Sequence, residues 1–309
     1  MVAFIATLVV ISLISERSLF WLVASRLPSF RWFIYFGILV INLFTKRTIF
    51  KMPSIGIASS ALLSVLHGLL SLMSAGSITE PWRIVLLMTS YHLVSLISGS
   101  TRNFPQRFSS ITFLVFGLGA VIFSDRQWIV GAVYAASWFI GGIAGLIRAQ
   151  VLKGSELEEV EFQESLVMII IAIALFPIIT PFQRFFPTMN HTAPLSSITA
   201  VISHFKDCLI VCDESTLSSD NCSYLSSALI IGWWLTHFSL SGILQRCLNE
   251  LGCDKTSVIY SAGLFVTSVL LFTKFHSEQE IIGALAIFLG VLLSHLKPVE
   301  SLDQPLITG

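Results

Sequence analysis

The sequence has few charged side chains. Only 12% of its 309 residues are Asp, Glu, Lys or Arg, whereas a soluble domain usually carries about 25%. The 18 basic and 18 acidic residues are too few to cover the surface of a water-soluble globule of this length. They cancel to a net charge of zero and form no basic block, which argues against a nucleic-acid partner. The composition excludes an ordinary soluble protein.

The motifs that accompany enzymatic or metal chemistry are also missing. The five cysteines form no CxxC pair, the seven histidines are scattered, and no His/Cys cluster has the spacing of a metal site. The sequence holds no P-loop, no Ser/His/Asp set and no paired carboxylates inside an apolar stretch. We therefore predict a protein that is not an enzyme and has no metal and no cofactor.

Long apolar runs are abundant instead. Hydrophobic residues make up 54% of the chain, including 24 Phe and seven Trp. Ten stretches approach the length of a helix that crosses about 30 Å of hydrocarbon. Because they lack the alternation of barrel strands, we predict an all-α, polytopic membrane protein with about ten transmembrane helices. The stretches are 2–24, 29–44, 55–73, 82–97, 108–124, 128–149, 162–181, 225–244, 257–272 and 281–296.

The distribution of basic residues predicts the orientation in the membrane. With an even number of spans, both termini lie on one side. Loops on that side carry ten Lys or Arg residues, against seven on the other. Since basic residues are enriched in cytosolic loops, we predict that both termini are cytosolic.

The long segment 182–224 supports the same orientation. It contains Asn-x-Ser/Thr sequons at Asn190 and Asn221, together with three of the five cysteines. Glycans and disulfides belong on the lumenal or extracellular side, which is where ten spans place this loop. We predict a glycosylated loop in the lumen of the Golgi apparatus or endoplasmic reticulum. The alternative is that short sequons occur here by chance.

An internal repeat links the two halves of the chain. Shifting the sequence by 173 residues aligns two apolar segments, with Gly117 on Gly290. The segments belong to the fifth and tenth predicted helices, and this odd spacing inserts the two halves with opposite orientation. Inverted repeats build many secondary transporters. We divide the chain into 1–150, the first repeat with the sixth helix, and 151–309, which holds the lumenal loop and a short cytosolic tail.

Three features of the chain form a recognisable pattern. The first is the set of ten spans. The second is the stretch 272–294, FTKFHSEQEIIGALAIFLGVLLS, a short polar turn followed by a Gly-rich last helix. The third is SERSL at 15–19 followed by RLP at 26–28, where a known family often has Asn-Lys and then Phe-Pro. Over nearly its whole length the chain resembles the drug/metabolite transporter superfamily, particularly its nucleotide-sugar and triose-phosphate translocator branch.

The resemblance implies two inverted five-helix repeats and a carrier of nucleotide sugars or related phosphorylated metabolites. The sequence departs from the branch at 257–272, which lacks the Lys or Arg that commonly helps to hold an anionic substrate there. No clear nucleotide-sugar motif occurs at 225–244. A carrier of a neutral or cationic small molecule is therefore one alternative, and a non-transport membrane accessory protein is another.

Glu16 and Arg17 are the charged pair inside a predicted span. Neighbouring positions on a helix do not face each other, so we expect that they are not partners. One interpretation places both near the lumenal interface, with Arg17 snorkelling. The other places Arg17 in the central cavity, where it binds a phosphate group.

Polar aromatic residues supply further candidates. Tyr91, His92 and Tyr260 lie in corresponding helices of the two halves, and Trp233 lies one turn before His237. In a carrier they would stack on a base and bond to sugar hydroxyls. The alternative is that they form hydrogen bonds between packed helices.

Other residues are assigned structural roles. Arg148 ends the sixth predicted helix and is interpreted as a cytosolic anchor. The glycines at 117, 119 and 141–145 are predicted to allow close helix packing. An acidic run between the halves is interpreted as a solvated linker. Its members are Glu156, Glu158, Glu159, Glu161 and Glu164.

These features predict an antiporter that moves a nucleotide sugar or related phosphorylated metabolite across an endomembrane by alternating access. Its expected partners are this small molecule and the lipid bilayer, and a homodimer is compatible with the sequence. The predicted substrate-binding residues are Arg17, Tyr91, His92, Trp233, His237 and Tyr260.

Overall fold

The computed structural model is all-α in the part of the chain that it describes. The described residues are 2–27, 31–45, 52–78, 80–98, 104–152, 157–182, 203, 206–208, 224–251, 253–271 and 277–295. Their principal helices are α1 (Val2–Arg26), α2 (Arg31–Thr45), α3 (Ile55–Ala75), α4 (Pro81–Met88), α5 (Tyr91–Ser98), α6 (Phe104–Phe123), α7 (Trp128–Leu152), α8 (Leu157–Phe182), α10 (Tyr224–Leu251), α11 (Cys253–Leu270) and α12 (Glu278–His295).

The apolar stretches of the sequence correspond to these helices. Each of the ten predicted stretches overlaps a described helix, and α1, α3, α6, α7, α10 and α12 are long and apolar enough to cross a membrane. Large apolar side chains such as Phe108 and Phe116 on α6 and Leu285 on α12 are more than half exposed. Apolar surface of this extent marks contact with lipid or with another protein. The all-α prediction is confirmed for the described residues, and these six helices fit the predicted polytopic membrane protein.

The predicted span 82–97 is not continuous, because it is divided into α4 and α5 at Thr89 and Ser90. The amides of these two residues donate to the carbonyl oxygens of Leu86 (3.0 Å) and Leu87 (3.2 Å), as in a tight turn. Their hydroxyl groups bond to backbone carbonyls, and the Ser90 hydroxyl reaches across to α7. The Thr89 hydroxyl thus gives a carbonyl at the end of α4 a second donor, and the Ser90 hydroxyl joins the break to α7.

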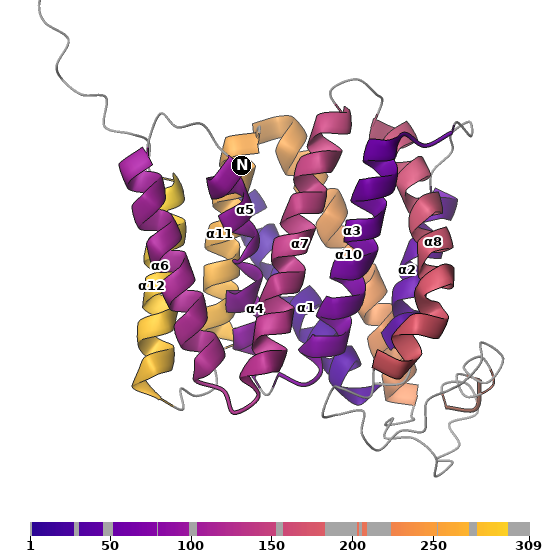
Figure 1. Ribbon diagram of the computed structural model, residues 1–309, viewed down its shortest axis with the longest axis horizontal. Helices are drawn as coiled ribbons and strands as arrows, with labels where there is room; N and C mark the ends of the chain where they lie inside the picture. The colour runs from indigo at the N-terminus through magenta and orange to yellow at the C-terminus, as the bar shows by residue number, and fades with distance from the viewer. Residues whose placement is uncertain are drawn as a thin grey trace, which may run out of the picture.

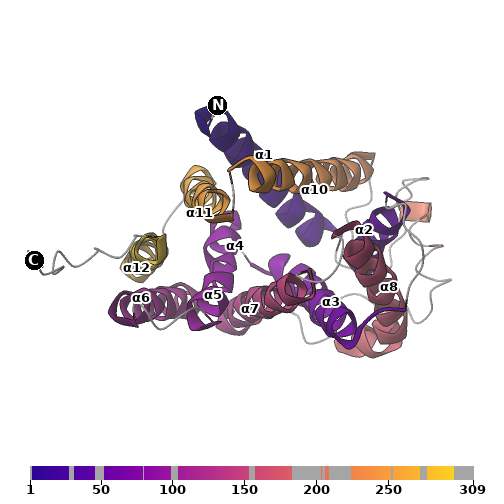
Figure 2. The same ribbon diagram turned by 90° about the horizontal axis from the view of Figure 1, so that it is seen from above.

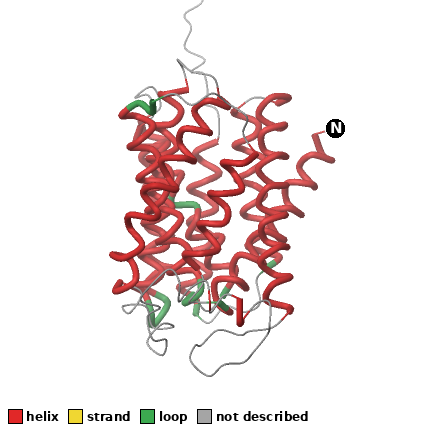
Figure 3. Tube along the Cα trace, turned by 90° about the vertical axis from the view of Figure 1, so that its right-hand side faces the viewer, coloured by secondary structure: helices red, strands yellow, loops and turns green. Residues whose placement is uncertain are grey.

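The helices stand side by side in the same general direction (Figure 1). α6 and α12 pack together at one edge, whereas α2 and α8 lie toward the opposite edge (Figures 1 and 2). Seen from above, α1 with α10 and α3 with α7 form two contacting pairs on opposite sides of the interior (Figure 2). Most of the helices extend between the same two levels (Figure 3), as expected for a protein that crosses a bilayer, whereas α5 lies above α4 (Figure 1).

α6 and α12 approach closely at three glycines. A Cβ atom on Gly117 would lie 2.7 Å from the carbonyl oxygen of Gly283, and one on Gly290 would lie 3.0 Å from that of Ser110. Each would press on the backbone of the neighbouring helix, so the predicted packing role of Gly117 is confirmed. Gly119 has no atom within 4 Å of an added Cβ, so the same prediction is wrong for Gly119.

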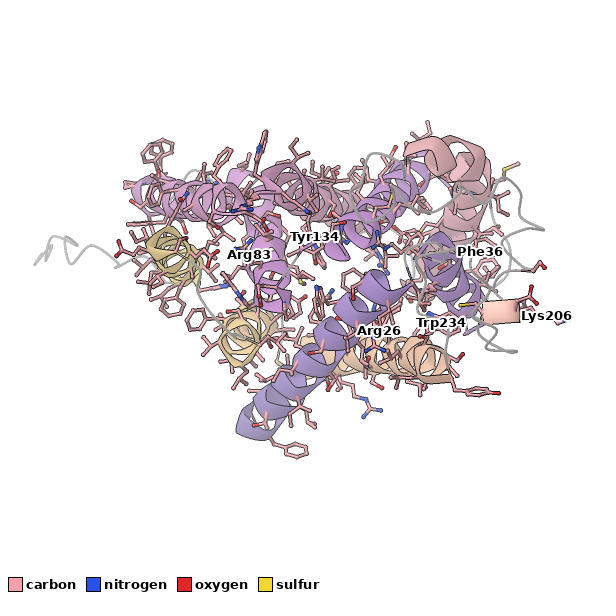
Figure 4. All side chains as sticks on the ribbon, turned by 90° about the horizontal axis from the view of Figure 1, so that it is seen from below. Arg26, Phe36, Arg83, Tyr134, Lys206 and Trp234 are labelled. Atoms are coloured by element: carbon pink, nitrogen blue, oxygen red, sulfur yellow. The ribbon has the colours of Figure 1, made fainter. Side chains whose placement is uncertain are left out.

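Buried arginines near helix ends have structural partners. Arg83 on α4 forms ion pairs with Asp125 and Glu280, which tie α4 to the start of α12. Arg83 lies in the interior of the bundle in the view from below (Figure 4). Arg31 donates hydrogen bonds to backbone carbonyls at the C-terminal ends of α1 and α3. These contacts satisfy helix-end carbonyls that would otherwise lack partners.

Candidate functional site

A cavity of about 410 Å³ lies between α3, α5, α7, α8 and α11, so both halves of the chain contribute to it. Its lining combines hydroxyl groups, aromatic rings and one charged pair. The principal polar and aromatic lining residues are Ser60, Ser64, His67, Tyr91, Trp138 and Tyr260, with Arg148 and Glu164 as the charged pair.

One face of α3 supplies three of these side chains. Ser60, Ser64 and His67 are spaced by four and three residues, which places them on the same side of a helix. His67 is held in place by α7, because its Nδ1 donates to the Ser137 carbonyl oxygen at 2.8 Å. Its ring also meets that of Trp138 edge-on, with centroids 4.5 Å apart.

Glycines on α7 make room for the side chains opposite. An added Cβ on Gly141 would lie 2.9 Å from the His67 ring, and one on Gly142 would lie 2.9 Å from Val94 on α5. The predicted packing role is confirmed at these two glycines. It is wrong at Gly145, where an added Cβ has no atom within 4 Å.

An aromatic wall closes one side of the cavity. Tyr91 of α5 and Tyr260 of α11 come from different halves of the chain, and their ring centroids are 6.1 Å apart. Both line the cavity, as does Trp138. The structure therefore brings together the two tyrosines that the sequence places in corresponding helices.

Arg17 lies behind this wall and is paired with its neighbour. Its Nε lies 2.7 Å from Glu16 Oε2, so the prediction that these two are not partners is wrong. The long Arg17 side chain bends back toward the carboxylate, and its guanidinium carbon stands 5.1 Å from the Trp138 ring centroid. The guanidinium also contacts Tyr260. With 8% of Arg17 exposed, its position does not fit a snorkelling side chain.

The other oxygen of Glu16 faces α10. Trp233 Nε1 donates to Glu16 Oε1 at 3.1 Å, and His237 Nδ1 lies 3.4 Å from the same oxygen. Trp233 and His237 therefore do not line the cavity, and they are connected to it through the Glu16–Arg17 pair. Glu16 itself is 1% exposed, so these contacts offset the cost of removing its carboxylate from water.

His92 belongs to a different place. It is adjacent to Tyr91 but does not line the cavity, and its Nε2 lies 3.1 Å from the Ser261 hydroxyl. His295 Nε2 lies 3.0 Å from the same hydroxyl. This cluster joins α5, α11 and α12, and it borders the cavity through Tyr91, whose ring centroid is 4.0 Å from that of His92.

The sequence analysis missed the charged pair of the cavity. Arg148 forms ion pairs with Glu161 (2.7 Å) and Glu164 (3.3 Å). The interpretation of the acidic run as a solvated linker is therefore wrong for these two residues, which lie within the first turns of α8. Their spacing of three residues, which puts both on one helix face, was the available signal. Arg148 is a third exposed, so it reaches both the surface and the cavity.

Several predictions concern residues outside the described part of the chain. The sequons at Asn190 and Asn221 and the C-terminal segment 296–309 fall there, and so does most of the segment 182–224. Within it, the described residue Cys208 is disulfide-bonded. Among the described side chains, no group of three His, Cys, Asp or Glu residues could hold a metal ion.

Comparison with models of known protein families gives no match, and comparison with curated protein sequences gives none either. The class of the protein therefore rests on its architecture. It is an all-α integral membrane protein with six candidate spans among its described helices. Its distinguishing feature is a polar, aromatic cavity that both halves of the chain line.

Proposed function

We propose that this protein is a secondary carrier, not an enzyme, and that it moves a nucleotide sugar or related phosphorylated metabolite across an endomembrane by alternating access. The observation that carries the proposal is the interior cavity, where hydroxyl groups and aromatic rings from both halves surround a space suited to a small polar molecule. Carriers place such sites at the interface between their two halves.

The pattern of helix contacts supports an inverted repeat. Taking α4 and α5 as one broken helix, a shift of five helices relates α1 to α7, α3 to α10, and α4/α5 to α11. The contact of α3 with α7 then becomes that of α10 with α1, and the contact of α4/α5 with α7 becomes that of α11 with α1. The contacts of α6 with α12, α2 with α8, and α4 with α11 each map onto themselves.

The glycines of α6 and α12 follow the 173-residue shift found in the sequence. Gly117 approaches Gly283 and Ile287, whereas Gly290 approaches Ser110 and Leu114. The shift exchanges these two sets of partners. Any two antiparallel helices are related by an approximate local two-fold axis, so the exchange of partners alone does not support an inverted repeat. The support comes from the glycine found at both positions that the shift relates, Gly117 and Gly290.

The broken helix α4/α5 also favours a carrier. Discontinuous spans are typical of secondary transporters, where irregular backbone borders a binding site. Tyr91, the first residue of α5, lines the cavity directly after the break.

The preference for a phosphorylated substrate rests on the two arginines at the cavity. Arg148 lines it, and Arg17 stands behind Trp138 and Tyr260. A guanidinium group binds phosphate through two parallel hydrogen bonds. The aromatic wall offers flat surfaces on which a nucleotide base would stack.

A second candidate, a carrier of a neutral or cationic molecule, is favoured by the pairing of these arginines. Arg17 already contacts Glu16, and Arg148 contacts Glu161 and Glu164. An anionic substrate must therefore compete with protein carboxylates, whereas a neutral or cationic substrate need not.

Uptake into proteoliposomes containing the purified protein tests the proposal. Liposomes should be preloaded with nucleoside monophosphates and offered a panel of radiolabelled nucleotide sugars, sugar phosphates and organic cations. We expect saturable uptake of at least one phosphorylated compound and none in protein-free liposomes. Uptake confined to cations would favour the second candidate, and no uptake of any compound would favour an accessory protein.

The proposed orientation makes a separate prediction about glycosylation. If segment 182–224 is lumenal, the protein expressed in eukaryotic cells should carry glycans at Asn190 and Asn221. Asn190→Gln and Asn221→Gln should each remove one glycan-sized step in gel mobility, and the double variant should match enzymatically deglycosylated protein. A wild-type protein whose mobility glycosidase treatment does not change would contradict a lumenal loop.

A further inference from the structure

His67 presents one ring nitrogen to the cavity. Its Nδ1 lies 2.8 Å from the Ser137 carbonyl oxygen, which cannot donate, so Nδ1 carries a proton. In a neutral imidazole the other nitrogen, Nε2, then holds a lone pair and can only accept a hydrogen bond. In the part of the chain that the structure describes, Nε2 has no hydrogen-bond partner, and it is not a fully buried atom. A molecule in the cavity can therefore reach this acceptor.

Helix α7 fixes the direction of this ring. The ring atoms nearest to an added Cβ on Gly141 are Cγ (2.9 Å), Nδ1 (3.0 Å) and Cδ2 (3.1 Å), so Nε2 lies on the side of the ring farther from Gly141. The Trp138 ring meets the imidazole edge-on, with centroids 4.5 Å apart. These contacts and the bond to Ser137 hold the imidazole in one orientation. An acceptor that is already held in place loses little conformational freedom when a ligand binds.

The surroundings of His67 favour its neutral form. The Arg17 guanidinium carbon stands 5.1 Å from the centroid of Trp138, the ring on which His67 also packs. A positive charge on His67 would be repelled by this buried cation. The lone pair on Nε2 in turn repels phosphate oxygens, because these are acceptors too. The phosphate of a substrate therefore belongs elsewhere in the cavity.

Arg148 supplies a place for the phosphate at the other end of the cavity. Trp138 and Arg148 both line the cavity from α7, and ten residues separate them, which is roughly 15 Å along the helix axis. Arg148 is a third exposed and offers a guanidinium group, whereas His67 lies beside the aromatic wall. An extended nucleotide can therefore place its phosphate at Arg148 and its base against the aromatic wall, next to His67.

We propose that His67 recognises the base of the substrate: Nε2 accepts a hydrogen bond from an N–H group on the edge of the base while the base stacks on the aromatic wall. The substrate class is then a nucleotide whose base keeps this N–H group free. A site with a fixed acceptor rejects an analogue that lacks the donor, because Nε2 would lose water and gain no partner. This recognition rests on the proposed carrier function, whereas the orientation of the His67 ring does not.

The state of His67 can be tested without transport, by nitrogen NMR spectroscopy of the protein in lipid after labelling of its histidine nitrogens. The signals that disappear in folded His67→Gln protein belong to His67. We expect a protonated Nδ1 and an unprotonated Nε2, and the Nε2 signal should shift when the preferred nucleoside monophosphate is added. A ring protonated at Nε2, or at both nitrogens, would overturn the assignment of Nε2 as an acceptor.

Recognition of the base is tested by competition in the proteoliposomes. The nucleoside monophosphate that inhibits uptake best is compared with its analogue methylated at the edge N–H; for uracil these are UMP and N3-methyl-UMP. The methylated analogue should compete at least about tenfold less well. For uracil, 5-methyl-UMP is the size control, because it carries the methyl group elsewhere and keeps the N–H, so it should compete like UMP.

Two variants of similar size connect this preference to His67. His67→Leu has no acceptor and should compete nearly equally with both analogues, whereas His67→Gln, whose amide oxygen can accept, should keep most of the preference. If phosphorylated compounds are taken up but methylation has no effect in the wild type, or if His67→Leu keeps the full preference, the base contact is refuted and the carrier function stands. If no phosphorylated compound is taken up, the proposed function fails and the base contact fails with it.

Discussion

Replacing Arg17 with alanine should abolish uptake and also lower the stability of the protein. Among the described residues, the buried Glu16 carboxylate would keep Trp233 and His237 as partners. Removing one member of a buried ion pair typically costs about 3–5 kcal/mol. If Arg17 also binds the phosphate of the substrate, losing that contact costs roughly 2–5 kcal/mol, which is at least about a tenfold loss of affinity. Arg17→Lys keeps the charge and should impair uptake only partly.

A double variant separates the two effects of Arg17. Glu16→Gln combined with Arg17→Gln removes both charges and leaves no ionised group unpaired at this position. Its thermal unfolding in detergent should return to within a few degrees of the wild type, whereas uptake should remain lost. If the double variant transports at the wild-type rate, Arg17 serves only to balance Glu16. The carrier of a neutral or cationic molecule would then become the leading candidate.

Substitutions at the α6–α12 contact should also lower the stability of the protein. In Gly117→Val and Gly290→Val, the added Cβ atom would lie within 3 Å of backbone atoms of the opposite helix. Overpacking usually costs about 1–3 kcal/mol and more where the backbone itself must move. Because the two glycines occupy related positions, we expect similar reductions of the melting temperature and of folded yield.

Gly119→Val is the matched control for this experiment. Gly119 lies on the same helix, two residues after Gly117, and an added Cβ there meets no atom within 4 Å. The Gly119→Val variant also replaces a glycine with valine but creates no clash, so its melting temperature should stay close to that of the wild type. Equal destabilisation by Gly119→Val and Gly117→Val, measured by fluorescence-detected size exclusion after heating, would contradict the observed packing.

The sequence predicted the helices well because continuous apolar runs leave few alternatives inside a membrane. It did not predict the break between α4 and α5. Thr89 and Ser90 have little effect on hydropathy, and at the break the Ser90 hydroxyl bonds to the Ala135 carbonyl oxygen on α7. Such a partner depends on tertiary packing, which local sequence does not show.

The candidate site was predicted only in part, because its contacts also depend on tertiary packing. Tyr91 and Tyr260, which the sequence analysis assigned to corresponding predicted helices, do meet. Glu164 was interpreted as part of a solvated run, because four other glutamates precede it within eight residues, and the sequence does not show which member is buried. The spacing rule failed for Glu16 and Arg17, because it describes where side chains leave the helix and not how far a long arginine can bend.

The α6–α12 contact also has a consequence for synthesis of the chain. The first residue of α12 follows the last residue of α6 by 155 positions. At a translation rate of about 5–20 residues per second, α6 waits in the membrane roughly 10–30 s before α12 is made. During that interval the surface around Gly117 has lipid or another helix against it in place of Gly283. Assembly of this edge of the bundle can therefore finish only after α12 has been synthesised.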